Sequence, residues 1–135
     1  MIALLDACAI IYQVEGVAPF QARLAALLGT LRAAHPGLGL AVSRLSWIEC
    51  RTKPLRERQP HILARYDNFL NAADLAVVEI TAEIVDVATA LRAEHGLRTP
   101  DSIQAASAMA LGAGTAFVTN DPTFARIRGL EVKLL

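Results

Sequence analysis

Four carboxylates stand beside short apolar runs or at the start of a helix, where a folded chain could gather them. Carboxylates that converge repel one another by kcal-scale amounts unless a cation neutralises them. Oxygen ligands without His or Cys at ligand spacing favour Mg²⁺ or Mn²⁺ over zinc. The sequence therefore predicts a metal site made of Asp6, Glu49, Asp101 and Asp121.

Each of these acids, taken alone, has a simpler explanation. Asp6 at a strand-to-helix junction suits a helix N-cap, and Ser46 with Glu49 has the spacing of a capping box. Asp101 follows Thr99 as an N-cap and Pro100 at the first helical position, so it suits the helix dipole. The metal site is favoured only because all four acids occupy matching positions relative to the strands.

The elements that must position these acids alternate between strands and helices. We expect strands over 2–5, 38–42, 75–80, 115–119 and 131–134, and helices over 7–15, 19–34, 46–53, 59–73, 81–95 and 99–110. Pro54 should stop the third helix. Such alternation predicts a three-layer α/β/α domain spanning 1–135, with a mostly parallel central sheet of about five strands. Ligands of such sheets bind at the carboxyl ends of the strands.

Composition restricts the class of protein. With 135 residues and 54% hydrophobic content, the chain can bury a substantial core. No apolar run approaches the ~20 residues of a membrane span, and no basic stretch precedes the first apolar run, so we expect a cytoplasmic protein without membrane contact. Cys8 and Cys50 are too few for a disulfide framework, and we expect both to be reduced.

Charge is balanced overall but unevenly distributed. The net charge is zero, which argues against a general polyanion binder. The segment 44–65 holds six basic residues against two acids, whereas 67–121 holds eight acids against two arginines. This division suits a phosphate-bearing substrate beside a metal-loaded acidic site, and it equally suits two solvated helix faces.

Four motifs together resemble the PIN domain family. They are the apolar strand ending in Asp6, the stretch Ser43-Arg-Leu-Ser-Trp-Ile-Glu49, the stretch Thr99-Pro-Asp101-Ser-Ile-Gln-Ala-Ala, and the stretch Val118-Thr-Asn-Asp121-Pro-Thr-Phe124. The small size is similar to that of the VapC-type toxin ribonucleases of bacterial toxin–antitoxin pairs.

The resemblance implies metal-dependent cleavage of RNA in the cytoplasm, with the four acids holding one or two Mg²⁺ or Mn²⁺ ions that activate water and stabilise the leaving oxygen. It also implies a homodimer and an antitoxin protein that covers the acidic groove. Many relatives have Ser or Asn two residues after the first acid, where this chain has Cys8, a weaker hydrogen-bonding group. Substrate contacts are expected from Thr119, Arg44, Arg51 and Lys53.

Two other functions fit the same pattern. A receiver-like regulatory module would bind Mg²⁺ in an acidic pocket and accept a phosphoryl group on one Asp, although such a module should have paired acids after its first strand, where Asp6 stands alone. A catalytically silent PIN-like domain would act only in binding or dimerisation.

Overall fold

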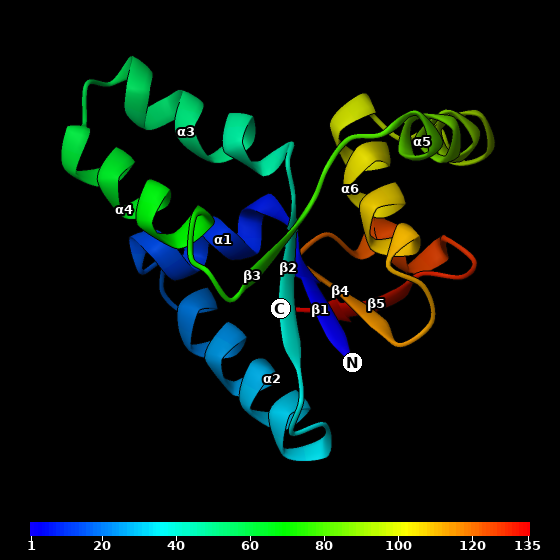
Figure 1. The fold of residues 1–135 in the computed structure, drawn as a ribbon, viewed down its shortest axis with the longest axis horizontal. Coiled ribbons are helices and arrows are strands. Elements are labelled where there is room, and N and C mark those ends of the chain that lie inside the picture. Colours follow the sequence, from blue (N-terminus) through cyan, green and yellow to red (C-terminus); the bar gives the residue numbers. More distant parts are fainter.

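Five strands form one sheet in which every neighbouring pair is parallel (Figure 1). The computed structural model describes residues 1–135. The order across the sheet is β3-β2-β1-β4-β5. The strands are β1 (Ile2–Leu5), β2 (Gly39–Ser43), β3 (Leu75–Val78), β4 (Thr115–Thr119) and β5 (Glu131–Leu134). The predicted three-layer α/β/α fold with a mostly parallel sheet is confirmed.

The helices divide between the two faces of the sheet. Four of them lie on one face: α1 (Ala7–Glu15), α2 (Phe20–Ala34), α3 (Ser46–Arg56) and α4 (Pro60–Leu70). The other face is covered by α5 (Ala82–His95), α6 (Thr99–Ala110) and the short 3₁₀ helix η1 (Pro122–Arg126). None of these helices has the length and apolar character needed to cross a membrane.

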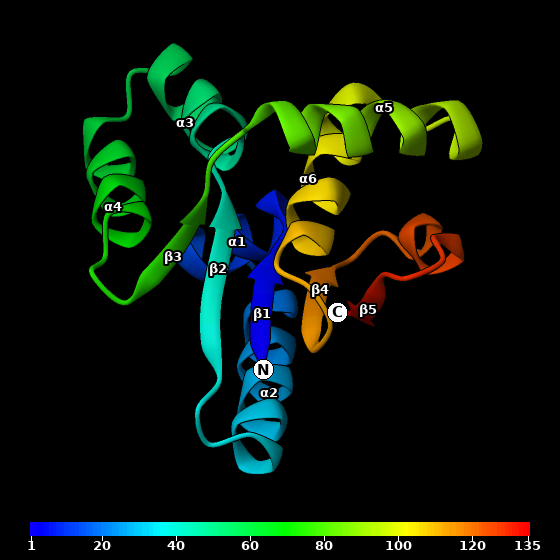
Figure 2. The same ribbon diagram turned by 45° about the vertical axis from the view of Figure 1, so that its right-hand side comes forward.

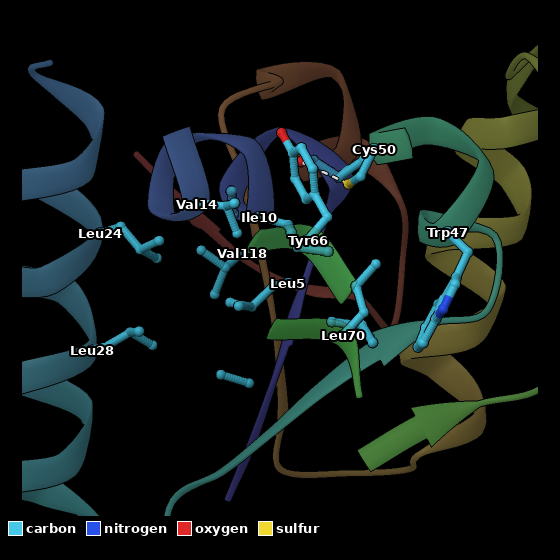
Figure 3. Packing of buried hydrophobic residues seen from close by; sticks show 14 of the residues in the cluster. Leu5, Ile10, Val14, Leu24, Leu28, Trp47, Cys50, Tyr66, Leu70 and Val118 are labelled. Carbon is cyan, nitrogen blue, oxygen red and sulfur yellow. Dashed lines mark hydrogen bonds between the residues drawn. The ribbon is translucent and has the colours of Figure 1, made fainter. Parts of the chain in front are cut away.

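The central strand β1 shows why the sheet is buried on both sides. Successive side chains of a strand point to opposite faces. Leu5 accordingly packs with the α1–α4 cluster, and Leu4 packs with the α5–α6 cluster. Figure 3 shows Leu5 and Val118 of the sheet facing Leu24 and Leu28 of α2 in the first cluster.

Helix α6 packs closely because its side chains are small. Ala105, Ala106 and Ala108 are fully or almost fully buried, as are Ser102 and Ser107 on the same helix. The helix lies against β2, β4 and α5. Its register relative to the sheet is therefore tightly fixed, which matters for any functional group that it carries.

Two local predictions are wrong. Pro54 does not stop the third helix, because α3 continues to Arg56 around it. Proline forfeits one hydrogen bond but has a helix-compatible φ, and the ring of Pro54 is buried, so packing offsets the loss. Thr99 is not the N-cap of α6 but its first residue, and Arg98 takes the N-cap position without a capping side-chain bond.

Candidate metal-binding active site

The four predicted acids lie at the carboxyl edge of the sheet, near the point where the strand order reverses. From β1 the chain first adds β2 and β3 on one side, and later adds β4 and β5 on the other. Open α/β sheets bind ligands at such a point. Asp6 directly follows β1 and Asp121 follows β4, while Glu49 and Asp101 lie in the first turns of α3 and α6, which begin at the same edge (Figure 2).

Asp6 is held by three neighbours. Its Oδ1 accepts a 2.8 Å bond from the backbone N–H of Ala7, and its Oδ2 accepts a 2.7 Å bond from the hydroxyl of Thr119. The thiol of Cys8 lies 3.7 Å from the same Oδ2. Burial raises the pKa of Asp6, the bonds from Thr119 and Ala7 oppose this, and the negative charge of Asp101 adds to it. Asp6 thus caps α1 and faces the other acids at once.

Glu49 does not form the capping box that its spacing with Ser46 predicts. Both side chains instead contact Gln104 of α6, whose Nε2 lies 2.7 Å from Oε1 of Glu49 and 3.1 Å from Oγ of Ser46. Burial raises the pKa of Glu49, the bond from Gln104 opposes this, and the charges of Asp6 and Asp101 raise the pKa further. The simple helix-capping explanation of Glu49 therefore fails.

Gln104 has a buried side-chain oxygen that lacks a hydrogen-bond partner, as expected in a polar binding site. Its side chain is almost fully buried, and its Oε1 has no hydrogen-bond partner. A buried polar atom without a partner costs free energy, so a glutamine at this position is not explained by packing alone. Gln104 lies one turn after Asp101 on α6, and it links Glu49 of α3 to that helix.

Asp101 is paired with an arginine. Nε of Arg98 lies 3.0 Å from Oδ2 of Asp101, and Nη2 lies 3.5 Å from Oδ1, so the guanidinium faces both carboxylate oxygens. The bond to Asp101 raises the pKa of Arg98, and the more distant charges of Asp121 and Glu49 raise it further. One guanidinium therefore stands among several acids.

Asp121 is ordered by the turn that follows it. Its Oδ1 accepts bonds from the backbone N–H of Thr123, at 2.9 Å, and from the Thr123 hydroxyl, at 2.8 Å. The backbone N–H of Asp121 in turn donates to the hydroxyl of Thr119 over 3.2 Å. Thr119 thereby connects Asp121 to Asp6, because the same hydroxyl donates to Asp6.

The donor set fits a hard divalent cation, although the side chains do not form a closed cage. No three His, Cys, Asp or Glu side chains of the protein are arranged to coordinate one ion directly. Mg²⁺ commonly keeps several waters and takes only one or two carboxylates. The site acids form an all-carboxylate set at one sheet edge. The charge of Asp101 helps to raise the pKa of Asp6, and the charges of Asp6 and Asp101 help to raise the pKa of Glu49, so a cation there would relieve the repulsion.

The four residues predicted to contact substrate fall in different places. Thr119 is fully buried and bonded to Asp6, so it is placed to orient that acid rather than to touch a substrate. Arg44 pairs with Glu79 and stacks over the Trp47 ring, 4.1 Å from its centroid. The two others lie on α3, where Arg51 pairs with Asp67 and Lys53 is exposed.

Sequence reasoning missed Gln104 and Arg98. The signal for Gln104 is a single large polar residue in a helix of small ones, three positions after Asp101. The signal for Arg98 is a cation three positions before Asp101, at a helix N-terminus where the dipole disfavours positive charge. Cys8 and Cys50 are both free thiols, as expected.

Comparison with known proteins finds one matching family model and several solved structures of the same fold. A family model described as "PIN domain" matches residues 3–130. A chain of the VapBC2 structure from Rickettsia felis, bound to a promoter DNA fragment, superposes with a TM-score of 0.76 at 20% identity, covering 99% of this chain and 98% of that one. A chain of VapBC-1 from nontypeable Haemophilus influenzae gives 0.73 at 18% identity, with the same coverage. A toxin–antitoxin complex from Klebsiella pneumoniae gives 0.66 at 22%, covering 95% and 94%. No curated protein sequence matches the chain.

Proposed function

The chain belongs to the PIN domain family, and from this premise we propose that it is a Mg²⁺- or Mn²⁺-dependent endoribonuclease. The observation that carries the proposal is the convergence of Asp6, Glu49, Asp101 and Asp121 on one sheet edge, each from a different element. Bound there, the ion would activate a water molecule and offset the charge of the phosphate.

Other residues of the chain would orient the carboxylates and contact the RNA. Thr119 fixes Asp6, and Gln104 fixes Glu49, so both carboxylates present defined oxygens to an ion. Arg44, Arg51 and Lys53 provide positive charge near α3 that would contact the RNA backbone. Reversing the charges of Arg51 and Lys53 should weaken RNA binding and flatten its salt dependence. Unaltered binding would remove these residues from the substrate surface.

We further propose that the protein is the toxin of a type II toxin–antitoxin pair, that it acts in the cytoplasm, and that it forms a homodimer. Support comes from solved relatives that are described as VapBC or toxin–antitoxin complexes. Exposed apolar side chains on α3 (Ile48 and Leu55, each 66% exposed) and α5 (Val85 and Val87) offer surface for an antitoxin or a second copy. Co-expression with a small protein encoded beside this chain should yield a complex in which cleavage is suppressed.

One experiment separates the nuclease from its alternatives. Purified protein is incubated with labelled RNA in Mn²⁺ and in chelator, and separately with a small phosphoryl donor such as acetyl phosphate. RNA cleavage that occurs with Mn²⁺ and does not occur with chelator supports the nuclease function. Phosphoryl uptake with intact RNA would favour the receiver-like module, and neither activity would leave a silent PIN-like domain.

A further inference from the structure

Arg98 stands where local helix energetics do not favour it. It is the N-cap residue of α6 and makes no capping bond with its side chain. A cation at a helix N-terminus is opposed by the macrodipole, which favours negative charge there. The neighbouring Thr99, the first residue of the helix, accepts a bond from Arg92 on its hydroxyl. Neither capping nor the helix dipole therefore explains the placement of Arg98.

The surroundings of Arg98 supply that explanation. It is the only basic side chain that forms an ion pair with any of the four site acids. Its side chain is 81% exposed, whereas that of Asp101 is 22% exposed. The guanidinium thus sits on the solvent side of a largely covered carboxylate, close to where a substrate would arrive.

We propose, on the basis of the proposed nuclease function, that Arg98 is a phosphate-binding residue of the site, held on Asp101 until a metal ion takes that carboxylate. The guanidinium is a planar fork whose geometry matches both carboxylate and phosphate groups. An exposed ion pair is weak, so a divalent cation can displace it. The released side chain then stands at the N-terminus of α6, itself a favourable place for a phosphate oxygen.

The first test measures metal binding without RNA. Arg98→Gln removes the competing cation, so Mn²⁺ binding measured by calorimetry should tighten about 2- to 5-fold, as expected when one exposed ion pair no longer competes. The matched control is Arg32→Gln in the last turn of α2, at the opposite end of the sheet, which removes the same charge and should leave Mn²⁺ affinity unchanged. Equal affinities for wild type, Arg98→Gln and Arg32→Gln would overturn the proposal.

The second test measures RNA binding without cleavage. Anisotropy of a labelled single-stranded RNA, read on metal-loaded protein with Ca²⁺ in place of Mg²⁺, should show at least about 5-fold weaker binding for Arg98→Gln. The slope of log affinity against log salt should fall by about 0.7, the value for one lost single-strand phosphate contact. Unchanged affinity and slope would overturn the phosphate contact. Neither test depends on catalysis. If wild type does not cleave RNA, the proposed nuclease function fails, but the two binding measurements still decide whether Arg98 contacts phosphate.

Discussion

The hydroxyl of Thr119, at the end of β4, donates a 2.7 Å hydrogen bond to Oδ2 of Asp6, which follows β1. Neighbouring parallel strands end at one edge, so a residue of one strand can orient a carboxylate of the next. Residues that orient metal ligands commonly contribute 10–100-fold to metal affinity or activity.

Thr119→Val should therefore reduce Mn²⁺ affinity and RNA cleavage by about 10-fold or more. Valine keeps the shape and β-branching of threonine but has no hydroxyl for Asp6. Calorimetry with Mn²⁺ and initial cleavage rates would measure the loss. Thr119→Ser is the control, because it keeps the donor and should retain most of the activity. Loss of activity in Thr119→Ser equal to that in Thr119→Val would show that packing, and not the hydrogen bond, matters here.

Cys8→Ser should strengthen Mn²⁺ binding. The Cys8 thiol is a weak donor at 3.7 Å from Asp6, and burial, followed by the charge of Asp6, raises its pKa to about 11, so it stays protonated. A hydroxyl is a stronger donor to the same carboxylate. We expect Mn²⁺ affinity to rise about 2- to 5-fold, with Cys8→Ala showing no gain. A serine variant that binds metal no better than the alanine variant would exclude a useful bond from this position.

Gln104→Met should move the pH dependence of Mn²⁺ binding upward. Methionine fills a similar volume but removes the donor that opposes the raised pKa of Glu49. The protonated form of Glu49 would then persist to higher pH, and a higher pH would be needed to bind metal. Ser107→Ala, which removes a partly buried bond to the Ile103 carbonyl on the same helix, is the control and should leave the pH profile in place. Parallel shifts in both variants would point to a general disturbance of α6.

Asp6→Asn should stabilise the metal-free protein near neutral pH. Folding raises the pKa of Asp6. Such a group contributes its whole stabilisation at pH values below its pKa in the unfolded chain, and this stabilisation is lost as the pH rises through its pKa in the folded protein. In acid, the variant and wild type should have the same melting temperature. Near neutral pH the variant should melt at a higher temperature, with a free energy of unfolding roughly 0.5–2 kcal/mol larger than that of wild type. Saturating Mn²⁺ should narrow the difference by stabilising wild type. A difference that does not change with pH would contradict the raised pKa.

The order of strands and helices could be predicted from the hydrophobic pattern of the sequence, whereas the side-chain contacts within the site could not. Short apolar runs alternating with helical stripes indicated the parallel sheet, and the order of elements placed four acids at one edge. The partner of Glu49 could not be inferred, because Gln104 lies far away in sequence and local spacing pointed to a capping box with Ser46. The position of Arg98 was likewise hidden, because Thr99 and Pro100 looked like the ordinary start of a helix.

The four acids are proposed to act together as one metal site that cleaves RNA. The most direct measurement follows cleavage of labelled RNA as Mn²⁺ is titrated, using wild type, Asp6→Asn and Asp101→Asn, with Mn²⁺ binding measured on the same preparations. Wild type should bind Mn²⁺ and cleave RNA in proportion to metal occupancy, and both variants, although folded, should lose at least about 100-fold in cleavage. Cleavage that persists in chelator, or variants as active as wild type, would contradict it.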